Sequence, residues 1–348
     1  MLESFCVRIM QRRGPTILRT VVASALLSVG FGVSSAVAMQ DSFSQPAADP
    51  QAELVQSLRS KGMAGLRSLW TTLGITTDIF KDLDDTASIT VTVNTFQVDG
   101  KGDNDTLLCM SDEAQVHMHL LVLSRNGDAW SSLGVINLWN QRATAPTLRM
   151  EVSGNDDRWL VVRSVGGSGA GFERVDETWY QQSGSAFTSV LSYPIAGSVE
   201  GHGLPFDRRF TGTLMGLKGE ESSPHVDVQL TATYTCGSGI EVEGCDLLFE
   251  RREAVRYTRA SSSSPFQIDE ANSGFSAVEV AGLFADDEQG FLQHNFESLK
   301  SMAVNGDAPR RTWLKLFLDR QSESTEKAAI VAILNAADST AVEQSTLP

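Results

Sequence analysis

Basic residues are scarce in this sequence. Its 348 residues include 28 Lys and Arg against 43 Asp and Glu, so the formal net charge is −15. Nucleic acids are bound mainly through clustered Lys and Arg, and anionic membrane surfaces attract basic segments. The shortage therefore argues against nucleic acid as a partner and against docking on an anionic membrane.

Complete catalytic patterns are also missing. The sequence has no H-E-x-x-H, no Cys-x-x-Cys and no G-x-S-x-G, which the glycine-rich stretch 166–171 misses by one residue. Glycine and proline follow no collagen-like period, and 41% hydrophobic residues is too many for a disordered chain. The sequence therefore indicates a folded protein, and the evidence for an enzyme is weak.

The first 38 residues differ from the rest. Four arginines lie between residues 8 and 19, an apolar run covers residues 21–33, and Ala36-Val37-Ala38 forms a small-x-small sequence. This order is typical of a secretory signal peptide, here predicted over residues 1–38. The apolar run is shorter than the roughly 20 residues that a membrane-spanning helix needs, so an uncleaved anchor is the weaker alternative. We expect a secreted or periplasmic protein with no stable membrane insertion after cleavage.

Cleavage changes both the charge and the cysteine count. Residues 1–38 hold 4 Arg and 1 Glu, which leaves 24 basic and 42 acidic residues and a net charge of −18. Three cysteines remain, and secretion would place them in an oxidising compartment. Cys236 and Cys245 close a short loop and are the predicted disulfide, which leaves Cys109 without a partner. The alternative is three reduced, buried thiols.

A period of two dominates residues 87–260. Val226, Val228 and Leu230 alternate with polar residues, and Asn126-Gly127 is a two-residue hairpin signal. Roughly ten to twelve short strands without intervening helices predict an antiparallel β-meander. We expect an α+β fold in which this meander forms a curved sheet, a sandwich or a barrel.

Helical periodicity flanks the β region on both sides. Residues 39–86 read as a linker and a helical segment that opens at Asp49-Pro50, where Asp serves as N-cap. Residues 261–348 begin with a serine-rich loop and continue as a C-terminal helical unit. The predicted domains are therefore 1–38, 39–86, 87–260 and 261–348.

An acidic loop provides the strongest local signal for a bound ion. Asp99, Asp103 and Asp105 alternate with glycines, and such oxygen-rich loops curl around hard cations. The loop resembles the Asp/Gly calcium loops of FG-GAP repeats and dockerins, although Lys101 stands where those loops carry Asp or Asn. The resemblance is confined to this loop, identifies no family for the whole chain, and implies a calcium ion held by the three aspartates. An ordinary polar hairpin turn is the alternative.

A second metal hypothesis rests on two histidines. His117 and His119 are two residues apart, so on a strand both imidazoles would lie on one face. The sequence supplies no third ligand at a recognisable spacing, and solvent-facing histidines are the alternative.

Three further groups of side chains have functional and structural interpretations. Glu173, Asp176 and Glu177 form a carboxylate cluster that either catalyses glycoside hydrolysis or lies on a solvent-exposed face. Arg208-Arg209 and Arg251-Arg252 form basic islands interpreted as cross-strand partners of carboxylates. The tryptophans in or beside strands either stack on flat ligands such as sugars or lie in the core. These are Trp130, Trp139, Trp159 and Trp179.

Two functional hypotheses remain. The first is a non-catalytic binding or structural module of a bacterial envelope that offers a sheet face or edge to a protein or glycan partner and needs no cofactor. The second is a calcium- or zinc-dependent enzyme or sensor that uses Asp99–Asp105 or the His117/His119 pair.

Overall fold

The fold is described by a computed structural model. It covers residues 5–8, 50–75, 89–101, 105–112, 117–126, 129–139, 146–153, 156–201, 203–218, 224–285 and 287–345. The chain divides into two compact units, Val7–Val91 and Thr92–Pro348 with Met1–Cys6. Of the predicted signal peptide, only Phe5–Arg8 fall within the described residues, as strand β1.

The predicted α+β fold with antiparallel sheets is confirmed. The first sheet has the order β1-β2-β3-β4-β5, in which β2 is Ile89–Phe96, β3 Asp105–Asp112, β4 His117–Asn126 and β5 Ala129–Trp139. The second has the order β13-β12-β11-β10-β9-β8-β7-β6. Its strands are β6 Thr147–Val152, β7 Arg158–Gly169, β8 Phe172–Ser183, β9 Ala186–Val199, β10 Phe206–Lys218, β11 His225–Cys236, β12 Leu247–Thr258 and β13 Gln267–Ile268. Every neighbour in this sheet is also a neighbour in the sequence, which defines a meander.

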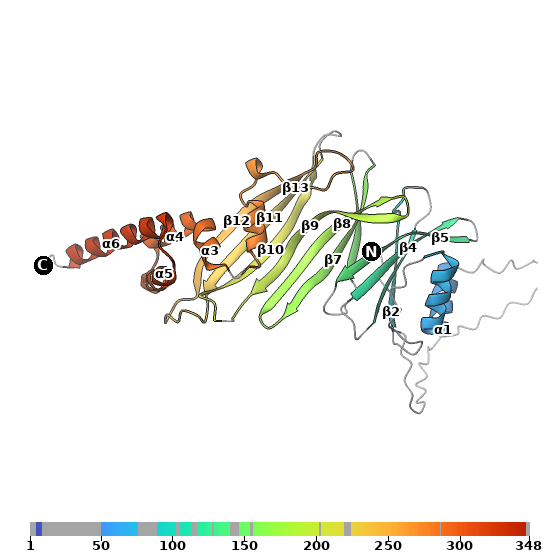
Figure 1. Cartoon of the computed structure of the whole chain (residues 1–348), viewed down its shortest axis with the longest axis horizontal. Helices are drawn as coiled ribbons and strands as arrows, with labels where there is room; N and C mark the ends of the chain where they lie inside the picture. The colour runs from blue at the N-terminus through green and yellow to red at the C-terminus, as the bar shows by residue number, and fades with distance from the viewer. Residues whose placement is uncertain are drawn as a thin grey trace, which may run out of the picture. The chain divides into compact units, whose positions relative to one another are not determined.

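The second sheet is open. Among the described residues it runs from edge strand β6 to edge strand β13 without closing on itself, which excludes the barrel among the three predicted forms. Figure 1 shows β7 to β12 side by side, with α3 next to β12.

Strand β7 is buried on both faces. Leu160 and Val162 belong to a core shared with β3, β4 and β5 of the first sheet. Trp159 and Val161, on the opposite face, belong to the larger core that includes the C-terminal helices. A strand that is covered on both faces has a continuous apolar sequence, here Trp159-Leu160-Val161-Val162, and not an alternation of apolar and polar residues. Sheet-on-sheet packing is therefore confined to one end of the second sheet.

The helices lie where helical periodicity was predicted. They are α1 Pro50–Thr72 in the smaller unit and, after β13, the short 3-10 helix Glu270–Asn272, α2 Ala277–Gly282, α3 Glu288–His294, α4 Phe296–Asn305, α5 Ala308–Arg320 and α6 Thr325–Ser345. Helix α1 is kinked at Gly62, where φ is 56°. Asp287 and Asp307 cap α3 and α5 through side-chain bonds to backbone N–H groups, so local sequence sets the helix starts.

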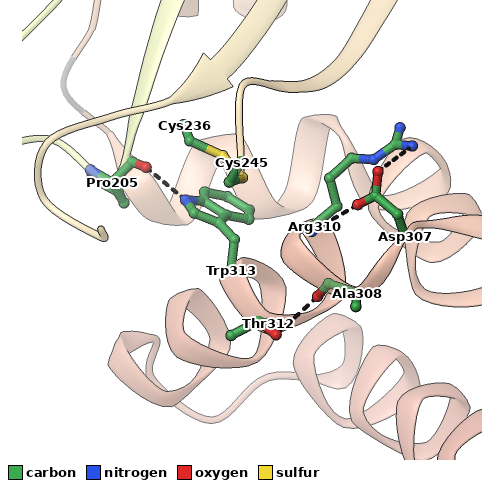
Figure 2. Close-up of a disulfide and its surroundings, with 8 residues drawn as sticks. All are labelled: Pro205, Cys236, Cys245, Asp307, Ala308, Arg310, Thr312 and Trp313. Atoms are coloured by element: carbon green, nitrogen blue, oxygen red, sulfur yellow. Dashed lines mark hydrogen bonds and ion pairs between the residues drawn. A yellow bond between two sulfur atoms is a disulfide. The ribbon is translucent and has the colours of Figure 1, made fainter. Parts of the chain in front are cut away.

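Aromatic side chains join the C-terminal helices to the sheet. Phe206 of β10 stacks on Phe291 of α3 with a centroid distance of 3.8 Å, and Phe291 meets Phe317 of α5 edge to face at 5.5 Å. The indole N–H of Trp313 in α5 donates to the carbonyl of Pro205 at 2.8 Å (Figure 2). This bond satisfies a buried donor and fixes α5 against the start of β10.

Figure 2 also shows the predicted pair Cys236 and Cys245 joined as a disulfide beside Trp313. The Cα atoms of the two cysteines are 5.9 Å apart. The enclosed loop packs tightly, because a Cβ on Gly239 would lie 2.1 Å from the carbonyl oxygen of Gly203. Arg320 of α5 donates to the Gly239 carbonyl at 2.9 Å. This hydrogen bond fixes the disulfide loop against helix α5.

None of the helices in the described part of the chain is both long enough and apolar enough to cross a membrane. The disulfide is consistent with an oxidising compartment.

Replacing both Cys236 and Cys245 by Ser is expected to lower the free energy of unfolding by about 2–3 kcal/mol, because the cross-link restricts the unfolded chain. Urea denaturation with and without reductant measures the loss. Reduced wild-type protein serves as the control and should match the double variant. Equal stability of the oxidised wild type and the variant would contradict the prediction.

Candidate functional site

Two adjoining hollows lie where the last strands of the second sheet meet helices α2 to α4. The first, called the recess, has an interior volume of about 30 Å³, room for one water molecule. The second, called the edge groove, has a volume of about 520 Å³ between Glu250–Glu253 of β12 and Gln293–Ser298 of α3 and α4. Arg251, His294 and Asn295 line both hollows, which therefore share a wall.

Arg251 organises the wall of the recess. Its Nη1 lies 2.9 Å from Oε1 of Glu279 and donates to the carbonyl of His294 at 2.8 Å. Its Nη2 donates to the carbonyl of Gly274 at 3.2 Å, and the guanidinium lies 4.3 Å from the ring centroid of Phe275. One side chain of β12 thus fixes the end of α3 and the start of α2.

Glu279 completes this arrangement as part of a capping box. Its carboxylate accepts from the N–H and the hydroxyl of Ser276 at 2.8 and 2.9 Å. Burial raises the pKa of Glu279, but the bonds from Ser276 and Arg251 outweigh burial and hold the pKa below its usual value. The carboxyl group therefore stays ionised at neutral pH.

The outer edge of β12 is only partly covered. Strand β13 pairs with the last two residues of β12. The segment after β13 hydrogen-bonds to the preceding backbone carbonyls of β12. The N–H of Asp269 donates to the carbonyl of Arg256 at 2.8 Å, and the N–H of Gly274 donates to the carbonyl of Ala254 at 2.8 Å. These bonds show that the even-numbered residues of this stretch point their backbone groups away from β11.

On the N-terminal side of Ala254, no described residue pairs with this edge of β12. By the same period of two, the N–H and C=O groups of Glu250 and Arg252 point outward, and no bond from another described residue reaches them. Both side chains are exposed on the sheet face away from the helices, where Glu250 and Arg252 lie opposite Thr233 and Thr231 of β11. Arg252 forms no ion pair within the described residues. The edge groove therefore runs beside four free backbone groups flanked by one negative and one positive side chain.

The carboxylate cluster of β8 does not converge on a site. Glu177 is 2% exposed and accepts two bonds of 2.7 Å from Arg149, one of 2.9 Å from Arg163 and one of 2.7 Å from the hydroxyl of Tyr193. Burial raises the pKa of Glu177, but these donors together hold it below its usual value. Asp176 lies on the opposite face with Arg174, 2.7 Å away. Glu177 is thus a structural ion-pair centre.

Two of the three predicted calcium ligands lie in the described residues, and Asp103 lies outside them. Oδ2 of Asp105 accepts the N–H of Val98 at 2.8 Å and that of Asp99 at 3.2 Å, which closes the turn. The ammonium of Lys101 lies 3.8 Å from Oδ2 of Asp99, where it competes with a cation. Within the described ranges no three His, Cys, Asp or Glu side chains gather as a metal site.

The predicted histidine pair is partly described. Nδ1 of His119 lies 2.8 Å from Oδ1 of Asn137 on β5, a hydrogen bond across the sheet. The side chain of His117 lies outside the description, so the zinc hypothesis stays a prediction.

No protein-family model and no curated protein matches this chain. The sequence showed Arg251-Arg252 as one of two basic islands, and it contained no sign of the groove beside it. The wall Gln293–Ser298 comes from a separate helical segment about 40 residues later, and no local pattern links it to β12.

Glu177→Gln is expected to lower the free energy of unfolding by about 3 kcal/mol at pH 7, because Arg149 loses its buried partner. The pKa of Glu177 is lowered in the folded state, so its contribution is complete above the unfolded pKa of about 4.3 and disappears as the pH falls through the folded value. Urea unfolding from pH 7 to pH 3 should show the difference shrinking below about pH 4. The exposed control Glu241→Gln should change stability by less than about 0.5 kcal/mol; a pH-independent difference would contradict the assignment.

Asp105→Ala is expected to lower stability by about 1–3 kcal/mol, because the buried N–H of Val98 and the partly buried N–H of Asp99 lose their acceptor. Thermal unfolding of the variant and the wild type in calcium and in EDTA separates this role from metal binding. We expect the same loss in both buffers. A loss that appears only in calcium would support the calcium hypothesis instead.

Proposed function

We propose that this protein is a non-catalytic binding protein of a bacterial envelope, secreted or periplasmic, that holds part of a partner protein in the edge groove. The observation that carries the proposal is the groove of about 520 Å³ beside an unpaired strand edge. Ligand-binding pockets typically have volumes of about 300–1,000 Å³. Free N–H and C=O groups at a sheet edge are a common means of binding polypeptides.

The positions of the tryptophans favour a protein over a glycan as partner. Stacking on a sugar requires an exposed ring face. Trp159 and Trp179 are 0% exposed, Trp130 is partly exposed on β5, the side chain of Trp139 lies outside the described residues, and no described tryptophan lines the edge groove. The groove presents mainly polar and charged side chains together with backbone groups. These features suit an extended polypeptide better than a saccharide ring.

The chemistry of the recess favours binding over catalysis. A general acid or base works best with a pKa near the operating pH, whereas the pKa of Glu279 is lowered. Arg251 is engaged in holding helices, and the recess admits one water molecule. Arg251 and Glu279 therefore position the helices that border the edge groove.

The compartment is inferred from two features. The signal-peptide pattern of residues 1–38 predicts export, and the disulfide between Cys236 and Cys245 is consistent with an oxidising environment.

A photo-crosslinking amino acid at Gln293, an exposed residue of the groove wall, is expected to give a discrete adduct in the cells that make the protein. The same group at Asp319, exposed on α5, is the control and should give none. Ser298→Trp, which fills the groove, should abolish the adduct in chains that still fold. Equal labelling at both positions, or an adduct that Ser298→Trp leaves unchanged, would contradict the proposal.

A further inference from the structure

The free part of β12 has the properties of an acceptor strand. Glu250 and Arg252 together direct two N–H donors and two C=O acceptors away from β11, at the strand edge that borders the edge groove. At about 3.3 Å per residue, Glu250–Glu253 offer roughly 13 Å of edge. The helical wall Gln293–Ser298 stands across from this edge and leaves about 520 Å³ between them.

The groove suits a single extended segment better than a second copy of this chain. Edge-to-edge pairing of two β12 strands would bring in the partner's β11 and its own helical wall, beside the same edge. A lone extended peptide fills the space next to β12 without those elements. Antiparallel pairing is the arrangement of every ladder in this sheet and is slightly more stable per residue than parallel pairing.

We propose that a segment of the partner polypeptide adds to β12 as an antiparallel strand, with an acidic residue opposite Arg252 and a basic residue opposite Glu250. This inference rests on the proposed function and names its binding mode and ligand chemistry. The added strand hydrogen-bonds through the same two residues, since directly opposite residues with outward backbone groups exchange both bonds.

Side-chain chemistry defines the motif. Cross-strand partners of opposite charge stabilise a sheet, and like charges directly opposite destabilise it. In an antiparallel partner the residue opposite Arg252 comes two positions before the residue opposite Glu250. The residue between them lies on the same sheet face as Arg251, toward the helical wall Gln293–Ser298, which favours a small side chain there. The motif is therefore acidic–small–basic in an extended segment.

The test uses the peptide Thr-Val-Glu-Thr-Lys-Val-Thr, labelled with fluorescein, and the full mature protein in a fluorescence anisotropy titration. We expect saturable binding. Exchanging Glu and Lys within the peptide should weaken it about fivefold, because two attractive pairs become repulsive. N-methylation of the Glu and Lys nitrogens should weaken it at least about tenfold. N-methylation of the Thr between them, whose N–H points away from β12, is the matched control and should have a smaller effect.

A charge-swap variant tests the register. Glu250→Lys combined with Arg252→Glu should prefer the exchanged peptide. Arg209→Glu, an exposed arginine of β10 on the same sheet face, should keep the original preference. Both substituted positions on β12 are exposed, and urea unfolding confirms that each variant folds.

The outcomes separate this inference from the proposed function. If Gln293 still crosslinks a partner but the two peptides bind equally or not at all, the strand-addition mode is wrong and the proposed function stands. If neither crosslinking nor peptide binding is observed, both are wrong. A dimer in sedimentation that Arg252→Glu dissociates would show that a second copy covers the edge, which also overturns the inference.

Discussion

The larger sheet of this protein is open, so its two faces and two edges must each be covered or exposed to water. The first sheet covers one face beside β7, and the chain after β12 covers the other face. Strand β7 lies where both covers meet, which explains its uninterrupted apolar run. The edge at β12 is covered only near its end, by β13 and the backbone that follows. The part of the edge that stays uncovered forms one side of the edge groove.

Arg251 connects the covering helices to this edge. Its guanidinium reaches the carboxylate of Glu279, the carbonyl of His294 and the carbonyl of Gly274. The bonds from one arginine to several elements satisfy groups that would otherwise be buried without partners. Because α3 ends at this contact, the position of the groove wall depends on it. The recess and the edge groove are therefore two consequences of one ion-pair network.

Much of the fold was predictable from local patterns, and the candidate site was not. Alternation along Val226–Leu230 and turn residues between strands indicated the meander, and short spacing indicated the pair Cys236 and Cys245. Sandwich and barrel remained undecided because closure depends on contacts between distant strands. The acidic loop matched a calcium pattern, yet Asp105 closes its own turn, which composition alone does not reveal. The groove joins residues 250–253 to 293–298, and only tertiary packing brings them together.

The meander has a consequence for how the molecule folds. From β6 to β13 each strand pairs with the next in the sequence, so no ladder in this sheet has to join strands that are separated by other strands. A hairpin between successive strands closes a shorter loop than a pairing between distant strands, so less loop entropy is lost at each step. Hairpins can therefore form in order as the chain is delivered N-terminus first. The helical wall comes last, so β12 spends part of folding as an exposed strand edge, and self-association through that edge is a hazard during this interval.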